Sequence, residues 1–341
     1  MTAPLPPFQS RTLITAALAL AILAPWIASG FQVFQLTQIW VYAIAIVGLN
    51  LLTGFNGQIS LGHGAFYAIG AYSEAILVSH FGLPYWGALP FAAAISFAAG
   101  FSFGLPALKL EGHYLALATF ALALAVPQLL KYEKFEDWTG GVQGLFLDKP
   151  EAPLHLPLDA DQWLYYFTLI ITLGLFYLAN NLLDGRVGRA ITAIRDQPVA
   201  AESMGVDVAL FKTQTFGVSA LYTGVAGAMS AIVIQFVAPD SFTMFLSIYL
   251  LVGVVIGGVG SLYGAFIGAA FIVLIPDVAS SISKAATGAI YGIMLIALMY
   301  VLPSGGWGLL EKARAWLGRA RRAPASGPAP IQVPERRAGP R

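Results

Sequence analysis

The chain has little charge and no cysteine. Lys, Arg, Asp and Glu together make up 10% of its 341 residues, whereas about a quarter of the residues of an average soluble domain are charged. Apolar side chains account for 58% of the sequence. The lack of cysteine excludes disulfides and thiolate metal sites. The lack of charge over long stretches is typical of an integral membrane protein.

Motifs for catalysis and for phosphate binding are also missing. No Gly-Lys dipeptide occurs, so the chain has no Walker A loop, and any ATP must be bound by a partner. The four histidines show no ligand-like spacing, so we expect no metal. The segment from Gly100 to Gly104 matches the nucleophile-elbow pattern, but it lies inside an apolar stretch, which favours a helix-packing site. We therefore expect neither a catalytic residue nor a cofactor in this chain.

Short charged islands separate long apolar stretches. A helix needs about 20 residues to cross about 30 Å of hydrocarbon, and we predict an all-α, polytopic transmembrane helix bundle of about ten spans, with eight to ten compatible with the pattern. The eighth and ninth stretches are short, and the glycines from Gly257 to Gly260 could form a break within the membrane instead. The predicted spans are 12–29, 32–52, 64–80, 86–107, 113–130, 163–183, 213–237, 244–257, 262–276 and 286–302.

Basic residues predict the orientation, because Lys and Arg beside spans are retained on the cytoplasmic side. With ten spans and both termini inside, fourteen cations are cytoplasmic and four are outside. This arrangement places a loop at 131–162 on the outer face and a polar loop at 184–212 in the cytoplasm. Residues 1–310 then form the transmembrane domain. Residues 311–341 are basic and rich in Pro and Ala, which predicts a disordered cytoplasmic tail.

The segment from Gly54 to Gly64 combines four glycines with four polar side chains between two apolar stretches. A broken or re-entrant helix that lines a cavity uses both features, and we predict that this segment borders a substrate pathway. The alternative is an ordinary helix-linking loop whose glycines only permit tight packing. The candidate pathway residues are Asn56, Gln58, Ser60 and His63.

Glu74 is the only carboxylate inside a predicted span, about 15 Å along the helix from Gly64. An ionised acid facing lipid is costly, so an intramembrane acid is a candidate functional residue. The alternative is a hydrogen-bonded or protonated packing residue.

Glycines also recur at short spacing near the end of the chain, which lets helix backbones approach closely. They are Gly253, Gly257, Gly260, Gly264 and Gly268. A four-residue echo, between the sequence that starts at His63 and the one that starts at Tyr263, hints at an internal repeat.

The cytoplasmic loop contains a second helical signal. Residues 187–204 have helix-compatible spacing, and a loop of this length between spans is often a docking surface. A solvated connector would not explain its apolar face, which comprises Ala190, Ile191, Ile194, Ala201 and Met204.

At these residues the chain resembles the inner-membrane permease subunits of branched-chain amino acid ABC importers, of the LivM type. Five stretches carry the resemblance in family order from about residue 40 to 275. One departure leaves the substrate open: many relatives carry a Glu shortly after the second stretch, whereas this chain has no acid there before Glu133. The stretches are Gly48–Gly54 with Gly70–Tyr72, Tyr114–Phe120, Thr139–Leu145, Gly185–Gly205, and Gly257–Gly264 with Gly268 and Ala269.

The resemblance implies a permease that forms the pathway for branched-chain amino acids or a related small amino acid or amide. It implies a bacterial inner-membrane location and, as partners, a second homologous permease, two cytoplasmic ATPase subunits that bind the ATP, and a periplasmic binding protein; no nucleic acid is expected. It also implies a coupling helix that contacts the ATPase, with Arg189, Arg195, Ala201, Glu202 and Gly205 as candidate residues. The alternative is a secondary, ion-coupled transporter, for which Glu74 alone is thin support.

Overall fold

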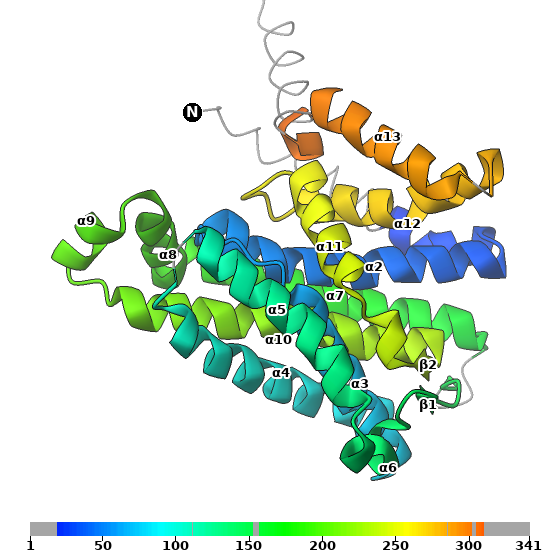
Figure 1. Ribbon diagram of the computed structural model, residues 1–341. Coiled ribbons are helices and arrows are strands. Elements are labelled where there is room, and N and C mark those ends of the chain that lie inside the picture. The colour runs from blue at the N-terminus through cyan, green and yellow to red at the C-terminus, as the bar shows by residue number, and fades with distance from the viewer. Residues whose placement is uncertain (1–18, 111, 153–156, 285, 302–304, 310–341) are drawn as a thin grey trace, which may run out of the picture.

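The structure is a bundle of long apolar helices. A computed structural model describes residues 19–110, 112–152, 157–284, 286–301 and 305–309 (Figure 1). Within this part of the chain, seven helices are long and apolar enough to cross a membrane. The all-α, polytopic membrane architecture predicted from the sequence is confirmed.

The predicted spans from the second to the tenth each correspond to a helix. Of these, α3 with 17 residues and α13 with 15 are not among the seven, and the 14-residue α11 is included only together with the residues that precede it from Pro239. Residues 19–27 are helical and belong to the first predicted span, whose residues 12–18 lie outside the described residues. The helices are α2 (Gly30–Asn50), α3 (His63–Ser79), α4 (Tyr85–Ala107), α5 (His113–Leu130), α7 (Ala160–Asp184), α10 (Val208–Ile234), α11 (Met244–Gly257), α12 (Gly264–Ile282) and α13 (Thr287–Val301).

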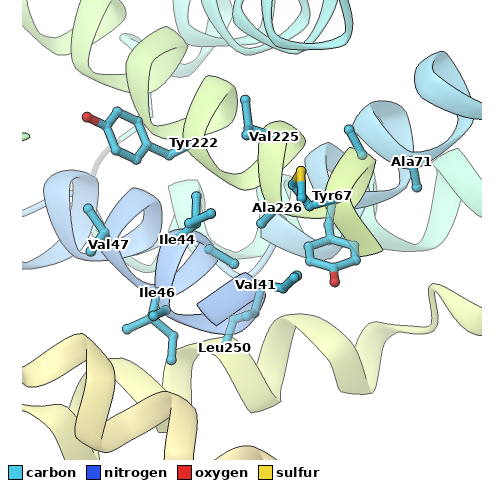
Figure 2. Close-up of a cluster of buried hydrophobic side chains, with 14 of the residues drawn as sticks. Val41, Ile44, Ile46, Val47, Tyr67, Ala71, Tyr222, Val225, Ala226 and Leu250 are labelled. Atoms are coloured by element: carbon cyan, nitrogen blue, oxygen red, sulfur yellow. The ribbon is translucent and has the colours of Figure 1, made fainter. Parts of the chain in front are cut away.

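Helix α10 is the centre of the bundle. It packs along α2, α3 and α4. Of an apolar stretch of 18 residues in α10, 83% is buried inside the protein, against 28% for α5 at the periphery. Figure 2 shows apolar side chains of α2, α3, α10 and α11 meeting around Ala226. Close packing of this kind drives helix association in a membrane, where the hydrophobic effect between helices is absent.

Glycines bring the backbones of neighbouring helices into contact. A Cβ atom at Gly70 of α3 would collide with the carbonyl of Gly224 in α10. The glycines of α11 and α12 behave in the same way, since a Cβ at Gly268 would collide with the Gly253 carbonyl, and their predicted packing role is confirmed. Gly100 of α4 lies against Ala220 of α10, so the segment that matches a nucleophile elbow is a helix contact.

The two ends of the bundle carry different secondary structure: turns and a short strand pair at one end, and two short helices at the other. The loop predicted for the outer face contains a 3-10 turn η2 (Glu133–Phe135), α6 (Glu136–Thr139) and β1 (Leu145–Phe146). After α10, β2 (Phe236–Val237) pairs antiparallel with β1, and a second 3-10 turn, η4 (Pro239–Ser241), follows. The opposite end carries α8 (Arg186–Asp196) and α9 (Pro198–Ser203) (Figure 1).

The range 187–204, whose spacing predicted helix, is occupied by two helices. Gln197 between them has φ −157° and ψ 92°, an extended conformation. A residue before proline is pushed out of the helical region, and Pro198 then begins the next helix. The predicted apolar face is also divided. Ile191, Ile194 and Ala201 are buried as expected, but Met204 is 85% exposed.

We predict that Gly70→Ala lowers the stability of the protein. The new methyl group would force α3 away from α10, and overpacking of this kind costs about 1–3 kcal/mol. The midpoint of thermal aggregation in detergent is the measurement. Gly174→Ala is the matched control, since an added Cβ at Gly174 in α7 meets nothing within 4 Å. Equal midpoints for the two variants would contradict the close contact.

Candidate functional site

The segment from Gly54 to Gly64 is a break between two helices. Helix α2 continues into a π-helical turn, η1 (Leu51–Phe55), and α3 begins at His63. Residues 56–62 between them form no regular helix, and Gly57 has φ +75°, a conformation that favours glycine. The helices thus end and begin around these glycines, and the role of this segment beside a substrate pathway stays a prediction.

Side chains from the surrounding helices bind the backbone of this break. Thr119 of α5 accepts from the Leu61 N–H at 2.9 Å, and Ser247 of α11 accepts from the Gly64 N–H at 2.8 Å. Thr53 donates its hydroxyl to the Gln58 carbonyl at 3.1 Å. Non-helical backbone is tolerated inside a membrane protein only where such partners replace the lost helical bonds.

A buried hydrogen-bond chain runs through His63. Ser219 of α10 donates its only hydroxyl proton to the Gly48 carbonyl at 2.5 Å, so it must accept from His63 Nε2 at 2.6 Å. The other ring nitrogen, Nδ1, then accepts from Ser60 Oγ at 2.9 Å. This network assigns a neutral imidazole with its proton on Nε2. His63, Ser60 and Ser219 are all fully buried, and together they join the break to α2 and α10.

Asn50 joins this break to a second one. The α11–α12 connection at 258–263 is also non-helical, with φ +117° at Gly258 and +76° at Gly260. The Asn50 side chain accepts from the Gly260 N–H at 2.9 Å and donates to the Ser261 carbonyl at 2.8 Å. Each break precedes one copy of the four-residue echo, at the starts of α3 and α12.

Arg195 lies at the same place, on the cytoplasmic side of the predicted topology. Its Nη1 donates to the Gly54 carbonyl at 3.0 Å, and Nη2 pairs with Asp196 at 2.9 Å. Arg195 was predicted from the resemblance as a residue that contacts the ATPase. In the structure Nη1 of this exposed side chain reaches the break between α2 and α3, and its contact with the ATPase stays a prediction.

A half-open pocket of about 200 Å³ adjoins the break. Asn56 is 2% exposed, and neither polar atom of its side-chain amide has a hydrogen-bond partner among the described residues. Gln58 is half-buried and also lines the pocket, whereas Ser60 and His63 do not. Other lining residues come from the α4–α5 connection, α8, the start of α9 and the start of α10, among them Leu108, Leu110, Gly112, Ile194, Arg195, Pro198 and Lys212.

Glu74 lies within α3, apart from these groups. It is fully buried, and neither carboxylate oxygen has a hydrogen-bond partner among the described residues. A role for Glu74 in the pathway stays a prediction. No cluster of three or more His, Asp or Glu side chains that could hold a metal occurs within the described ranges.

The other candidate ATPase contacts lie in α8, in α9 and just after α9. Arg189, Glu202 and Gly205 are exposed, and Ala201 is buried. Gly205 has φ +84° directly after α9, which reverses the chain toward α10. Val199 is 71% exposed and Met204 is 85% exposed, so α8–α9 presents apolar side chains at the tip of the bundle.

Several residues of this site were missed by the sequence reasoning. Asn50 had a usable signal, because a polar amide within a strongly apolar span needs an internal partner. Ser219, Ser247 and Thr119 had none, since small hydroxyl residues are common in membrane helices, where they can bond within their own helix.

The geometry defines a class: a polytopic membrane protein with two linked helix breaks at one end of its bundle. Comparison with known proteins agrees, since the family model for the branched-chain amino acid transport system permease component matches residues 32–301. The chain belongs to this family. No solved structure matches it significantly.

Relatives in three organisms are similar to the chain. The high-affinity branched-chain amino acid transport system permease proteins LivM of Salmonella typhimurium and Escherichia coli are each 31% identical over 315 residues, which cover 86% of this chain and 74% of the relative. A probable branched-chain amino acid transport permease protein LivM of Methanocaldococcus jannaschii is 22% identical over 60% of this chain and 62% of its own length.

We predict that His63→Phe destabilises the protein by about 1–3 kcal/mol. The substitution removes both ring nitrogens and leaves the buried Ser60 hydroxyl without its acceptor. Thermal aggregation in detergent measures the effect. His113→Phe is the control, because His113 is exposed. A His63→Phe protein as stable as the parent would show that the hydrogen-bond chain contributes nothing.

Proposed function

We propose that this permease forms, together with a second homologous permease, the translocation pathway of an ATP-driven ABC importer. Two ATPase subunits bind and hydrolyse the ATP in the cytoplasm, and a periplasmic binding protein delivers the substrate. The substrate is a branched-chain amino acid or a related small amino acid or amide. The chain lies in a bacterial inner membrane with both termini in the cytoplasm.

The observation that carries this proposal is the placement of α8 and α9. They form an exposed segment at the end of the bundle where the two helix breaks meet (Figure 1). A partner that pushes on this segment would act directly on non-helical backbone inside the bundle. The family match and the names of the relatives support the same assignment.

A secondary transporter is the alternative, and nothing favours it. Ion coupling needs groups in the membrane that bind the ion, and these are usually several acids or paired polar groups. Glu74 is the one buried carboxylate among the described residues, and it has no polar partner there.

Uptake into proteoliposomes tests the proposal. We expect labelled leucine to enter only when the second permease, the ATPases, the binding protein and internal ATP are all present. The purified chain alone should hydrolyse no ATP, because it lacks a phosphate-binding loop. Uptake driven by an ion gradient without ATP would instead support a secondary transporter.

Val199 in α9 and Met204 directly after it are exposed apolar residues, and they generate a further prediction. Met204→Glu should weaken binding of the ATPase by about tenfold or more, because burial of a charge against an apolar groove is unfavourable. Met204→Leu is the control, since it keeps an apolar side chain of similar volume. Copurification of the ATPase with the tagged permease measures the effect. Equal recovery with both variants would place the docking contact elsewhere.

A further inference from the structure

The guanidinium of Arg195 connects α8 to the interior of the bundle. Arg195 lies in the last turn of α8. Its Nε and Nη2 bind Asp196 Oδ1 at 3.0 and 2.9 Å, which leaves Nη1 to donate to the Gly54 carbonyl at 3.0 Å. The aliphatic part of the side chain lies against Gly57, where a Cβ would be 2.9 Å from Arg195 Cγ. The ion pair with Asp196 therefore orients the guanidinium toward the break.

The Gly54 carbonyl needs a donor from outside its own helix. In the π-helical turn the Gln58 N–H binds the Leu52 carbonyl at 3.1 Å, and no backbone N–H in the described part of the chain binds the Gly54 carbonyl. Carbonyl groups at a helix C-terminus are unsatisfied, and the helix dipole makes this end negative. A guanidinium is suited to this position because it supplies both a donor and a positive charge.

Gly54 lies in close contact with the second break. A Cβ at Gly54 would lie 2.5 Å from the Gly260 nitrogen and would also collide with Asn50 Oδ1. Asn50 in turn holds the Gly260 N–H and the Ser261 carbonyl. A continuous path of contacts thus runs from α8 through Arg195 and Gly54 to the α11–α12 connection.

The other arginines of α8 do not follow this path. All three arginines of α8 are exposed, but among the described residues only Arg195 donates to the break, whereas Arg189 donates to the Asp184 carbonyl at the start of the same segment. Ile191 and Ile194 bury α8 against the bundle through apolar contact. Apolar contacts are not directional, whereas a charged hydrogen bond fixes one geometry.

We propose that Arg195 is a positioning residue that links movement of α8 to both helix breaks, holding them together until α8 is displaced. The link to transport rests on the proposed function. Such coupling requires a packed, hydrogen-bonded element, here α8 with the two breaks, that can adopt two discrete arrangements. Arg195 then acts inside the permease, not on the ATPase.

The first test uses the reconstituted complex. Arg195→Gln should leave ATP hydrolysis and ATPase copurification within about twofold of the parent, while leucine uptake per ATP falls by about tenfold, since a charged hydrogen bond is lost. Arg195→Lys keeps a cation and one donor and should restore part of the uptake. Arg186→Gln, at the exposed start of the same helix, should match the parent. A parallel loss of hydrolysis and ATPase binding in Arg195→Gln would overturn the proposal, because Arg195 would then act at the ATPase surface.

The second test needs only the isolated permease. The parent has no cysteine, so spin labels on cysteines introduced at Ile59 and Val259, both exposed residues of the two breaks, can report their separation. We expect a narrow distance distribution that broadens in Arg195→Gln and stays narrow in Arg186→Gln. An unchanged distribution in Arg195→Gln would also overturn the proposal. Should Arg195→Gln not fold, Arg195→Lys decides by the same measurement, with an intermediate width expected.

The two tests separate this inference from the proposed function. A parent complex that shows no ATP-driven uptake would refute the proposed function. The distance measurement would still decide whether Arg195 holds the two breaks together.

Discussion

Unsatisfied backbone groups inside a membrane protein are the constraint on which this structure depends. Residues 56–62 and 258–263 leave the helical state within the bundle, so their N–H and C=O groups lose the partners that a continuous helix supplies. Thr119 and Asn50 bind backbone groups within these segments, and Ser247 and Arg195 bind the flanking helix ends at Gly64 and Gly54, so the partners come from four different segments of the chain. The breaks are therefore held by the surrounding helices and not by their own sequence.

Close glycine contacts make this arrangement possible. Side-chain hydroxyls are short, so Ser219 can reach both His63 and the Gly48 carbonyl only because α2, α3 and α10 approach closely. A Cβ at Gly48 would lie 2.8 Å from the Ser219 carbonyl. The glycines and the polar contacts thus depend on one another, and a change in helix spacing would disturb both.

The site has two parts with different physical character. The buried part is a fully connected hydrogen-bond network, which favours one well-defined conformation. The outer part, α8 and α9, is exposed and divided at Gln197. A rigid network beneath an exposed segment is suited to receiving a displacement from a partner. Asn56 is the buried side chain of the break whose amide has no hydrogen-bond partner among the described residues.

The sequence by itself determined the class of protein and most of its helices. Long apolar stretches can be stable only as membrane helices, and a run of glycines and polar residues between two of them is best explained by a break. Pro198 also marked the division of the cytoplasmic helix, although its effect was overlooked. The predicted apolar face failed at Met204, which follows the end of α9 and is exposed.

Only the tertiary structure decided which groups meet. The resemblance made Arg195 a candidate ATPase contact, which stays a prediction, whereas its bond to the Gly54 carbonyl, 141 residues away in the chain, was not predicted. Asn50 and Gly260 are separated by 210 residues. Local propensity and hydropathy depend on near neighbours in the sequence, whereas these hydrogen bonds depend on how α2, α8, α11 and α12 pack. Packing in a membrane is set by shape at close range, so the partners of Asn50 and Arg195 followed from the fold alone.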